Sequence, residues 1–178
     1  MQFPARIFLT ASVCFASVYA GEIDFEVHNF HKVNDTVFRG AQPSAAGFAM
    51  LKKMGIATVI DLRESSHADS EAALVKAQGM QYINIPMKGM EAPSNAQIAK
   101  VLALINDAKT GPVFIHCKRG ADRTGTVLAC YRITHDHWDN AAALAEAKQR
   151  GMSVFQVAMH RYVKAYSAPL EVAGQPAN

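Results

Sequence analysis

Short apolar runs alternate with segments of helical spacing along most of the chain. The runs rich in β-branched and aromatic residues predict strands at 36–39, 56–62, 81–85 and 112–115. Apolar residues that recur every three or four positions predict helices over about 45–54, 69–78, 95–108, 124–136, 140–150 and 154–166. This order predicts an α/β fold: a mostly parallel central sheet of four or five strands with helices on both faces.

Polar residues mark the starts of several of these helices. Ser44 precedes the first helix, and Ser94 followed by Gln97 has the pattern of a capping box. Asp139 and Ser153 stand in the same way before the last two helices. We expect each of these serine and aspartate side chains to cap its helix.

The chain has the size and apolar content of one folded domain. It has 178 residues, of which 50% are hydrophobic, enough for a substantial core. Its formal net charge is only +3 and it has no run of Lys and Arg, which argues against a nucleic-acid-binding protein. We expect a single domain over residues 21–168 and a flexible tail over 169–178.

The first twenty residues differ in composition from the rest of the chain. Arg6 is the only charged residue among them, the run from Ile7 to Val18 is apolar, and Ala20 precedes Gly21. This is the pattern of a secretory signal peptide, since the apolar run is short for a membrane span. We expect a secreted or periplasmic protein with no stable membrane span after cleavage. An uncleaved N-terminal membrane anchor is the alternative.

Basic residues occur where the predicted strands end. The carboxyl ends of parallel strands meet at one edge of the sheet, and ligands bind there. Arg39, Arg63 and Lys88 each lie at or just after such an end. We therefore expect an anionic substrate at this edge.

The last predicted strand leads into the stretch from His116 to Gly125, which reads HCKRGADRTG. Cys117 lies here on a turn between a buried strand and a helix N-terminus. Backbone N–H groups of residues 118–123 can surround a phosphate dianion, and the positive end of the helix adds to its binding. Gly120 allows the turn, and Arg123 has the planar fork that binds two phosphate oxygens. The expected phosphate-binding residues are Lys118, Arg119, Gly120, Ala121, Asp122 and Arg123.

The same loop suits nucleophilic attack on the bound phosphate. Its positive field favours the thiolate of Cys117, and a thiolate next to phosphorus is a nucleophile in position. We expect a phosphocysteine intermediate that water then hydrolyses. Thr124 is placed to hydrogen-bond the sulfur in that second step. We expect His116 to brace the loop rather than to act as the base.

This stretch resembles the signature of the cysteine-based protein tyrosine phosphatases, in which His-Cys is followed by five residues, Arg, and Ser or Thr. His116, Cys117, Arg123 and Thr124 fill these positions, and VFRGAQPS and TVIDLRE resemble the opening elements of small bacterial dual-specificity phosphatases. The resemblance covers about residues 30–165. It implies one phosphatase domain without metal or other cofactor, acting on a phosphorylated protein or a small phosphorylated substrate.

The chain departs from that family at the general acid. The family has an Asp on a loop about thirty residues before the Cys, where it protonates the leaving oxygen. Residues 86–93 contain no Asp but do contain Glu91. Asp122 is the other candidate, because lipid phosphatases of the myotubularin and Sac types have an Asp at this loop position. We predict Asp122 as the acid, with Glu91 as the alternative; a loop brace and a solvated carboxylate are their competing roles.

Two further cations of the loop, Lys118 and Arg119, bear on the choice of substrate. Phosphoinositide phosphatases have Lys at the position of Lys118, and some phosphatases of inositol pyrophosphates have the same Cys-Lys-Arg-Gly run. A protein tyrosine or dual-specificity phosphatase is the leading prediction, and a phosphoinositide or inositol-polyphosphate phosphatase is the alternative. The missing loop Asp leaves a catalytically weak phosphate-binding module as a second alternative.

Cys130 is the other cysteine that follows the predicted signal peptide. Its place in the helix after the loop predicts a small buried core residue. A Cys117–Cys130 disulfide, which would disable the loop, is the alternative in an oxidising compartment.

Overall fold

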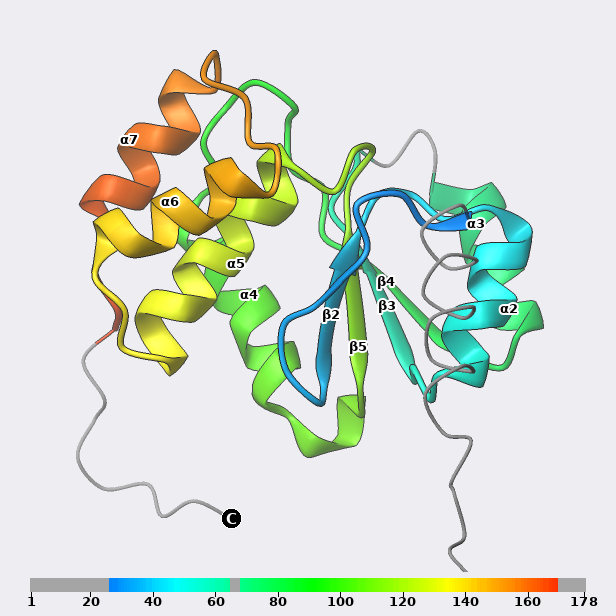
Figure 1. Ribbon diagram of the computed structural model, residues 1–178. Helices are drawn as coiled ribbons and strands as arrows, with labels where there is room; N and C mark the ends of the chain where they lie inside the picture. The colour runs from blue at the N-terminus through cyan, green and yellow to red at the C-terminus, as the bar shows by residue number, and fades with distance from the viewer. Residues whose placement is uncertain (1–25, 65–67, 170–178) are drawn as a thin grey trace, which may run out of the picture.

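The centre of the molecule is a five-stranded sheet (Figure 1). The protein is described by a computed structural model that covers residues 26–64 and 68–169. The strands are β1 (His31–Lys32), β2 (Val37–Gly40), β3 (Thr58–Asp61), β4 (Gln81–Asn84) and β5 (Val113–His116), in the order β1-β2-β5-β3-β4. All neighbours pair in parallel except β1, which is antiparallel to β2. The predicted mostly parallel sheet is confirmed.

Helices cover both faces of this sheet. On one face α2 (Ala45–Lys53) and α3 (Ala68–Ala77) pack against it, and on the other α4 (Asn95–Asn106) and α5 (Asp122–His135) do so. Successive strand residues point to opposite faces, so Val59 packs with α2 and α3 whereas Ile60 packs with α4 and α5. A short 3-10 helix, η2 (Ala108–Thr110), leads into β5.

Two further helices form a third layer outside α5. They are α6 (Asn140–Gln149) and α7 (Val157–Ala165), and their apolar residues Leu144 and Val163 share a cluster with Ile133 of α5. Because α5 contacts the sheet on one side and α6 and α7 on the other, its residues from Thr124 to Tyr131 are all buried. The first turn of α5 is thereby fixed from two sides.

Three of the four expected caps are confirmed, and one is wrong. Ser44 accepts from the N–H of Gly47, Ser94 forms the capping box with Gln97, and Asp139 accepts from Ala142. Ser153 does not cap α7, which begins four residues later. Its hydroxyl instead accepts from the N–H of Phe155 within a turn, so the segment from Ser153 to Gln156 is a loop.

The predicted signal peptide at 1–20 and nearly all of the tail at 169–178 lie outside the described residues, and both stay predictions. The domain boundaries at 21 and 168 stay predictions as well. Within residues 26–64 and 68–169, no helix combines the length and the apolar character that crossing a membrane requires.

Candidate active site

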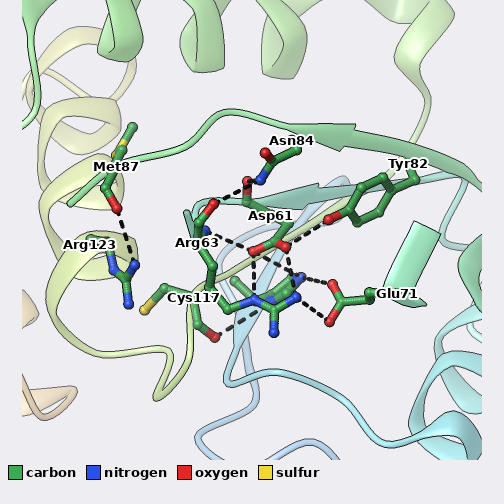
Figure 2. Close-up of polar contacts among 9 residues, drawn as sticks. Asp61, Arg63, Glu71, Tyr82, Asn84, Met87, Cys117 and Arg123 are labelled. Carbon is green, nitrogen blue, oxygen red and sulfur yellow. Dashed lines mark hydrogen bonds and ion pairs between the residues drawn. The ribbon is translucent and has the colours of Figure 1, made fainter. Parts of the chain in front are cut away.

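Cys117 lies at the middle of the sheet edge where the parallel strands end. It follows β5 directly, and the last residue of β5, His116, is in register with Gly40 of β2 and Asp61 of β3. Only 2% of Cys117 is exposed. In Figure 2 its sulfur points toward the guanidinium of Arg123, which comes from the first turn of α5. The sequence motif is thus assembled at the carboxyl edge of the sheet.

The carbonyl groups of the loop that follows are held away from its inner side. We call residues 117–123 the phosphate loop. The carbonyl of Lys118 accepts from the N–H of Gln42 at 3.3 Å. The carbonyl of Gly120 accepts from Nη2 of Arg39 at 2.7 Å and from Nδ2 of Asn29 at 3.1 Å. Because a peptide plane carries its C=O and N–H on opposite sides, these contacts turn the N–H groups of the loop the other way.

The N–H groups themselves are available to a ligand. Within the described part of the chain, those of residues 118 to 124 have no acceptor, and no side chain caps the N-terminus of α5. The hydroxyl of Thr124 is also buried without a partner among the described residues. Unpartnered N–H groups at a helix N-terminus attract an anion, and several in succession suit the oxygens of a phosphate.

Gly120 is required by the close approach of this loop to β2. Its φ is +65°, a conformation that residues with a Cβ seldom adopt. A Cβ at this position would lie 2.2 Å from the carbonyl carbon of Gly40. Any larger residue would therefore displace the loop from Arg39 and Asn29.

Asn29 and Arg39 support the loop, and sequence reasoning did not identify either role. Asn29 has a φ of +54°, and its amide reaches the carbonyls of Arg119, Gly120 and Arg150. Arg39 was expected at an anion-binding rim, but it is buried under the loop. Burial lowers the pKa of Arg39 to about 10, so the side chain stays charged at neutral pH. The only sequence signal for the supporting role of Arg39 was its position as a basic residue at the end of a strand.

Behind the loop lies a set of buried polar side chains that we call the buried network (Figure 2). It consists of the buried Asp61, Arg63, Glu71 and His116 and the half-buried Tyr82. Arg63 binds both oxygens of Asp61, at 3.0 and 2.8 Å, and one oxygen of Glu71 at 2.6 Å. Nε2 of His116 is 2.9 Å from the other Glu71 oxygen, and Tyr82 donates to Asp61 at 2.7 Å.

The charge of Asp61 is stabilised despite complete burial. Burial alone would raise the pKa of this carboxyl group, but the hydrogen bonds from Arg63 and the proximity of His116 outweigh it, so the pKa lies below its usual value. Asp61, Glu71 and His116 are residue types that also bind metals, and their donor atoms lie within 4.8 Å of one another. Here the guanidinium of Arg63 supplies the cation between the two carboxylates.

His116 connects the buried network to Cys117. Its Nδ1 lies 3.3 Å from the carbonyl oxygen of Cys117, and its Nε2 contacts Glu71. The ring is completely buried and stacks on Phe114 at 5.7 Å between centroids. These are the contacts of a residue that holds the loop; the bracing role stays a prediction.

The two candidate acids differ in their surroundings. Oδ2 of Asp122 is 2.5 Å from Nη2 of Arg119, and its Oδ1 accepts from the N–H of Ser153 at 2.9 Å. Glu91 is exposed, and its Oε1 accepts from Nζ of Lys88 at 2.9 Å. We call Arg119–Asp122 and Lys88–Glu91 the front pairs. Asp122 thus has the contacts of a brace, and Glu91 has the freer carboxylate.

The loop that carries Glu91 is tied to the phosphate loop and to the segment before α7. Nη1 of Arg123 donates to the carbonyl of Met87 at 3.1 Å, and Nε2 of Gln156 donates to the carbonyl of Gly89 at 3.0 Å. Gln156 is buried, and its Oε1 has no partner within the described residues. Sequence reasoning did not identify Gln156, because its contacts are with residues more than sixty positions away.

Three of the remaining predicted residues, Lys118, Arg119 and Ala121, lie on the phosphate loop. Lys118 is exposed, Ala121 is buried at the N-terminus of α5, and Arg119 is 63% exposed despite its pairing with Asp122. Cys130 is a fully buried free thiol, as its position predicted, and burial raises its pKa to about 12.

A family model described as "DSP-PTPase phosphatase fused to NAD+ Kinase" matches residues 13–165. The chain belongs to this family. It is thus a member of the cysteine-based protein tyrosine phosphatase superfamily, as the signature at His116 to Thr124 predicted.

Two curated relatives illustrate the range of the family. The dual specificity protein phosphatase TpbA of Pseudomonas aeruginosa (strain UCBPP-PA14) is 31% identical over 124 residues, which are 69% of this chain and 55% of TpbA. The inositol diphosphatase DSP2 of Oryza sativa subsp. japonica is 31% identical over 109 residues, 58% of this chain and 53% of that protein. The chain spans about half the length of these two relatives.

Solved structures agree with the fold. The crystal structure of P. aeruginosa TpbA has a TM-score of 0.69 at 28% identity and covers 78% of this chain and 85% of its own. TpbA in complex with pTyr has a TM-score of 0.67 at 28% identity, and the match covers 77% of this chain and 83% of that structure. The core catalytic domain of the PP-IP phosphatase SIW14 from S. cerevisiae shares the fold, with a TM-score of 0.70 at 20% identity. The match covers 79% of this chain and 86% of that domain.

Proposed function

We propose that this protein is a phosphomonoester hydrolase that acts through a phosphocysteine intermediate on Cys117. The observation that carries the proposal is the set of unpartnered backbone N–H groups of residues 118 to 124, directly after a cysteine at the sheet edge. Such a set binds phosphate oxygens, and the adjacent thiolate is the nucleophile.

The reaction has two steps. In the first, Sγ of Cys117 attacks phosphorus, the bond from phosphorus to the ester oxygen breaks, and a general acid protonates the departing oxygen. In the second, water attacks phosphorus, the bond from phosphorus to sulfur breaks, and phosphate leaves. Arg123 binds two phosphate oxygens in both steps, for which it exchanges its contact with the Met87 carbonyl. The buried hydroxyl of Thr124 hydrogen-bonds the sulfur as it departs.

For the general acid, the contacts favour Glu91 over Asp122. Both oxygens of Asp122 already accept hydrogen bonds, from Arg119 and Ser153, and these contacts fix the orientation of its carboxylate. Among the described residues Glu91 is held only by Lys88, and its loop is tied to Arg123 through Met87. Asp122 then serves mainly to hold the phosphate loop.

We propose phosphotyrosine in proteins as the main substrate, with dual specificity. TpbA, the relative named a dual specificity phosphatase, has been solved with pTyr. The charges at the front of the site also support this choice, because Arg119 and Lys88 are each paired with a carboxylate. A substrate with many phosphates would need these cations unpaired.

Soluble inositol phosphates and phosphoinositides are the second candidate. Lys118 is exposed and has no carboxylate partner among the described residues, and a 31% identical relative is named an inositol diphosphatase. One unpaired cation beside the loop is compatible with a second phosphate group on the substrate.

A substrate panel tests this proposal. It compares the protein with Cys117→Ser on phosphotyrosine peptides, phosphothreonine peptides, phosphoinositides and inositol hexakisphosphate. We expect the largest kcat/KM on phosphotyrosine, and no turnover by Cys117→Ser. Cys130→Ala is the matched control, since Cys130 lies in the core and should leave turnover intact. A protein inert on every substrate would refute the hydrolase, and a single burst without turnover would support the weak phosphate-binding module.

We also propose that the protein is exported and that residues 1–20 are removed on export. The support is the short apolar run after Arg6 and the small residues before Gly21. Mass spectrometry of the protein from the periplasm or medium tests this. A mature N-terminus at Gly21 is expected, and an intact Met1 in the membrane fraction would favour the anchor.

A further inference from the structure

The segment that links α6 to α7 exposes apolar side chains to water. Val154, Phe155 and Val157 are 69%, 80% and 51% exposed. In Figure 1 this segment lies at the top of the view, between the end of α6 and the start of α7. Single exposed apolar residues are common, but three within four consecutive positions indicate a contact surface.

Basic side chains continue this surface along α7. Arg161 and Lys164 follow Val157 by four and seven residues, so they lie on the same side of the helix, about 6 and 10 Å further along its axis. All three positions are exposed, whereas Met159 and Val163 between them are buried. We call the exposed residues the docking face: Val154, Phe155, Val157, Arg161 and Lys164.

The positive charges of the docking face are not compensated. Within the described part of the chain, neither Arg161 nor Lys164 has a carboxylate partner. Residues 147–170 include Lys148, Arg150, Arg161 and Lys164 but no Asp or Glu. This one segment therefore has more positive charge than the net +3 of the whole chain.

The neighbouring loops add to this charge and do not cancel it. The N–H of Ser153 donates to Asp122 at 2.9 Å, so the segment before α7 lies beside the phosphate loop. Asp122 and Glu91 each pair with a cation of their own. Lys118 of the phosphate loop is exposed and has no carboxylate partner among the described residues. The surroundings of the docking face are thus positive overall.

The surface of an anionic phospholipid layer fits this combination. Apolar side chains can enter the boundary between headgroups and acyl chains to a depth of about 5–10 Å, while cations one or two helical turns away stay level with the phosphates. A second copy of the chain fits less well, since two docking faces would bring like charges together. An acidic protein would need a cavity shaped for the apolar side chains, whereas a fluid lipid layer accepts them without one.

We propose that the docking face binds this protein to the surface of an anionic phospholipid membrane, without crossing it. The inference goes beyond the proposed hydrolysis and does not depend on it. Because Ser153 contacts Asp122, binding through the docking face places the phosphate loop next to the membrane.

Sedimentation with vesicles tests the inference. The full-length protein is mixed with vesicles of phosphatidylcholine alone, or of phosphatidylcholine with phosphatidylglycerol. We expect clear binding only to the anionic vesicles, weakened by high salt. Phe155→Ser should lower the affinity about tenfold, since an inserted aromatic side chain is lost. Arg161→Gln/Lys164→Gln should lower it about twentyfold, since each cation near an anionic surface contributes about fivefold.

Variants on the opposite face of the sheet are the matched controls. Leu74→Ser removes an exposed apolar side chain from α3, and Lys53→Gln/Lys76→Gln removes two exposed charges from α2 and α3. Both should bind vesicles like the wild type. The thermal midpoint of Phe155→Ser should equal that of the wild type, because the Phe155 side chain is largely exposed, and this separates a loss of binding from a loss of the fold.

Three results would overturn the inference. One is the absence of wild-type binding to anionic vesicles, and another is full binding retained by either Phe155→Ser or Arg161→Gln/Lys164→Gln. Because every variant keeps residues 1–20, binding through that segment would appear as binding that no variant weakens. The third is a dimer by light scattering that becomes a monomer in Phe155→Ser, which would assign the docking face to a second copy. Vesicle binding needs no turnover, so a failure of the proposed hydrolysis would leave this inference standing.

Discussion

The two groups of ion pairs around the phosphate loop differ mainly in their access to water. In the buried network, Asp61, Arg63 and Glu71 are each at most 5% exposed. In the front pairs, Lys88 and Arg119 are largely exposed. Buried charges depend on every partner, whereas exposed pairs contribute little and are screened by salt. The back of the site is therefore fixed, whereas at its front Lys88, Glu91 and Arg119 can adjust to the substrate around Asp122, whose side chain is only 11% exposed.

The largest expected effect comes from truncating the buried network. Asp61→Ala leaves Arg63 with one carboxylate and Tyr82 without its acceptor. We expect the free energy of unfolding to fall by about 3–5 kcal/mol, as for other broken buried pairs. Urea unfolding measures this, with Glu91→Ala as the exposed control that should leave the midpoint in place. Equal midpoints for both variants would remove the distinction between back and front.

The next effect concerns the two candidate acids. Glu91→Gln should lower kcat about a hundredfold for phenyl phosphate, whose leaving group needs a proton, and much less for p-nitrophenyl phosphate. Asp122→Asn, as a brace, should slow both substrates alike. A dependence on the leaving group in Asp122→Asn instead of Glu91→Gln would reassign the acid.

A smaller effect should appear in the acid range. Because the pKa of Asp61 is lowered in the folded state, its contribution to stability is complete above its unfolded pKa of about 4 and is lost as pH falls through the folded value. The difference in stability between the wild type and Asp61→Asn should therefore be constant above about pH 5 and shrink below about pH 4. Urea midpoints from pH 7 to pH 3 test this. A difference in stability between the wild type and Asp61→Asn that increases at acid pH would contradict this prediction.

The smallest effect is expected at Lys88. Its pKa is raised by the hydrogen bond that its ammonium group donates to Glu91, but the side chain is 65% exposed to water. Lys88→Ala should leave the thermal midpoint unchanged within error at both low and high salt. A clear destabilisation that disappears in salt would show that this front pair stabilises the fold after all.

The sequence predicted those features that depend on local pattern. The buried strands β2, β3 and β5 each contain two or three consecutive apolar residues, and the loop from Cys117 to Arg123 carries its chemistry within seven consecutive residues. Ser44, Ser94 and Asp139 cap because the helix they precede begins at once. The predicted cap at Ser153 is wrong because residues 154–155, although apolar, belong to a loop and not to the helix.

Features that depend on distant contacts could not be predicted in this way. Arg39 reaches a carbonyl 81 positions away, and Asn29 reaches carbonyls 90, 91 and 121 positions away. Glu71 gives no local signal either, since it is one of several polar residues on an otherwise ordinary helix. Their roles follow from the order of strands in the sheet, which residue spacing alone does not determine.

The contacts of Asn29 also bear on when the protein becomes active. They join the start of the described chain to the phosphate loop and to the residue after α6, so the full set of contacts around the loop needs these long chain closures. Non-local closures of this kind are the slow part of folding. Hydrolytic activity should thus be among the last properties to return during refolding, and a nascent chain that lacks α6 would have its nucleophile but not the contact that joins Asn29 to Arg150.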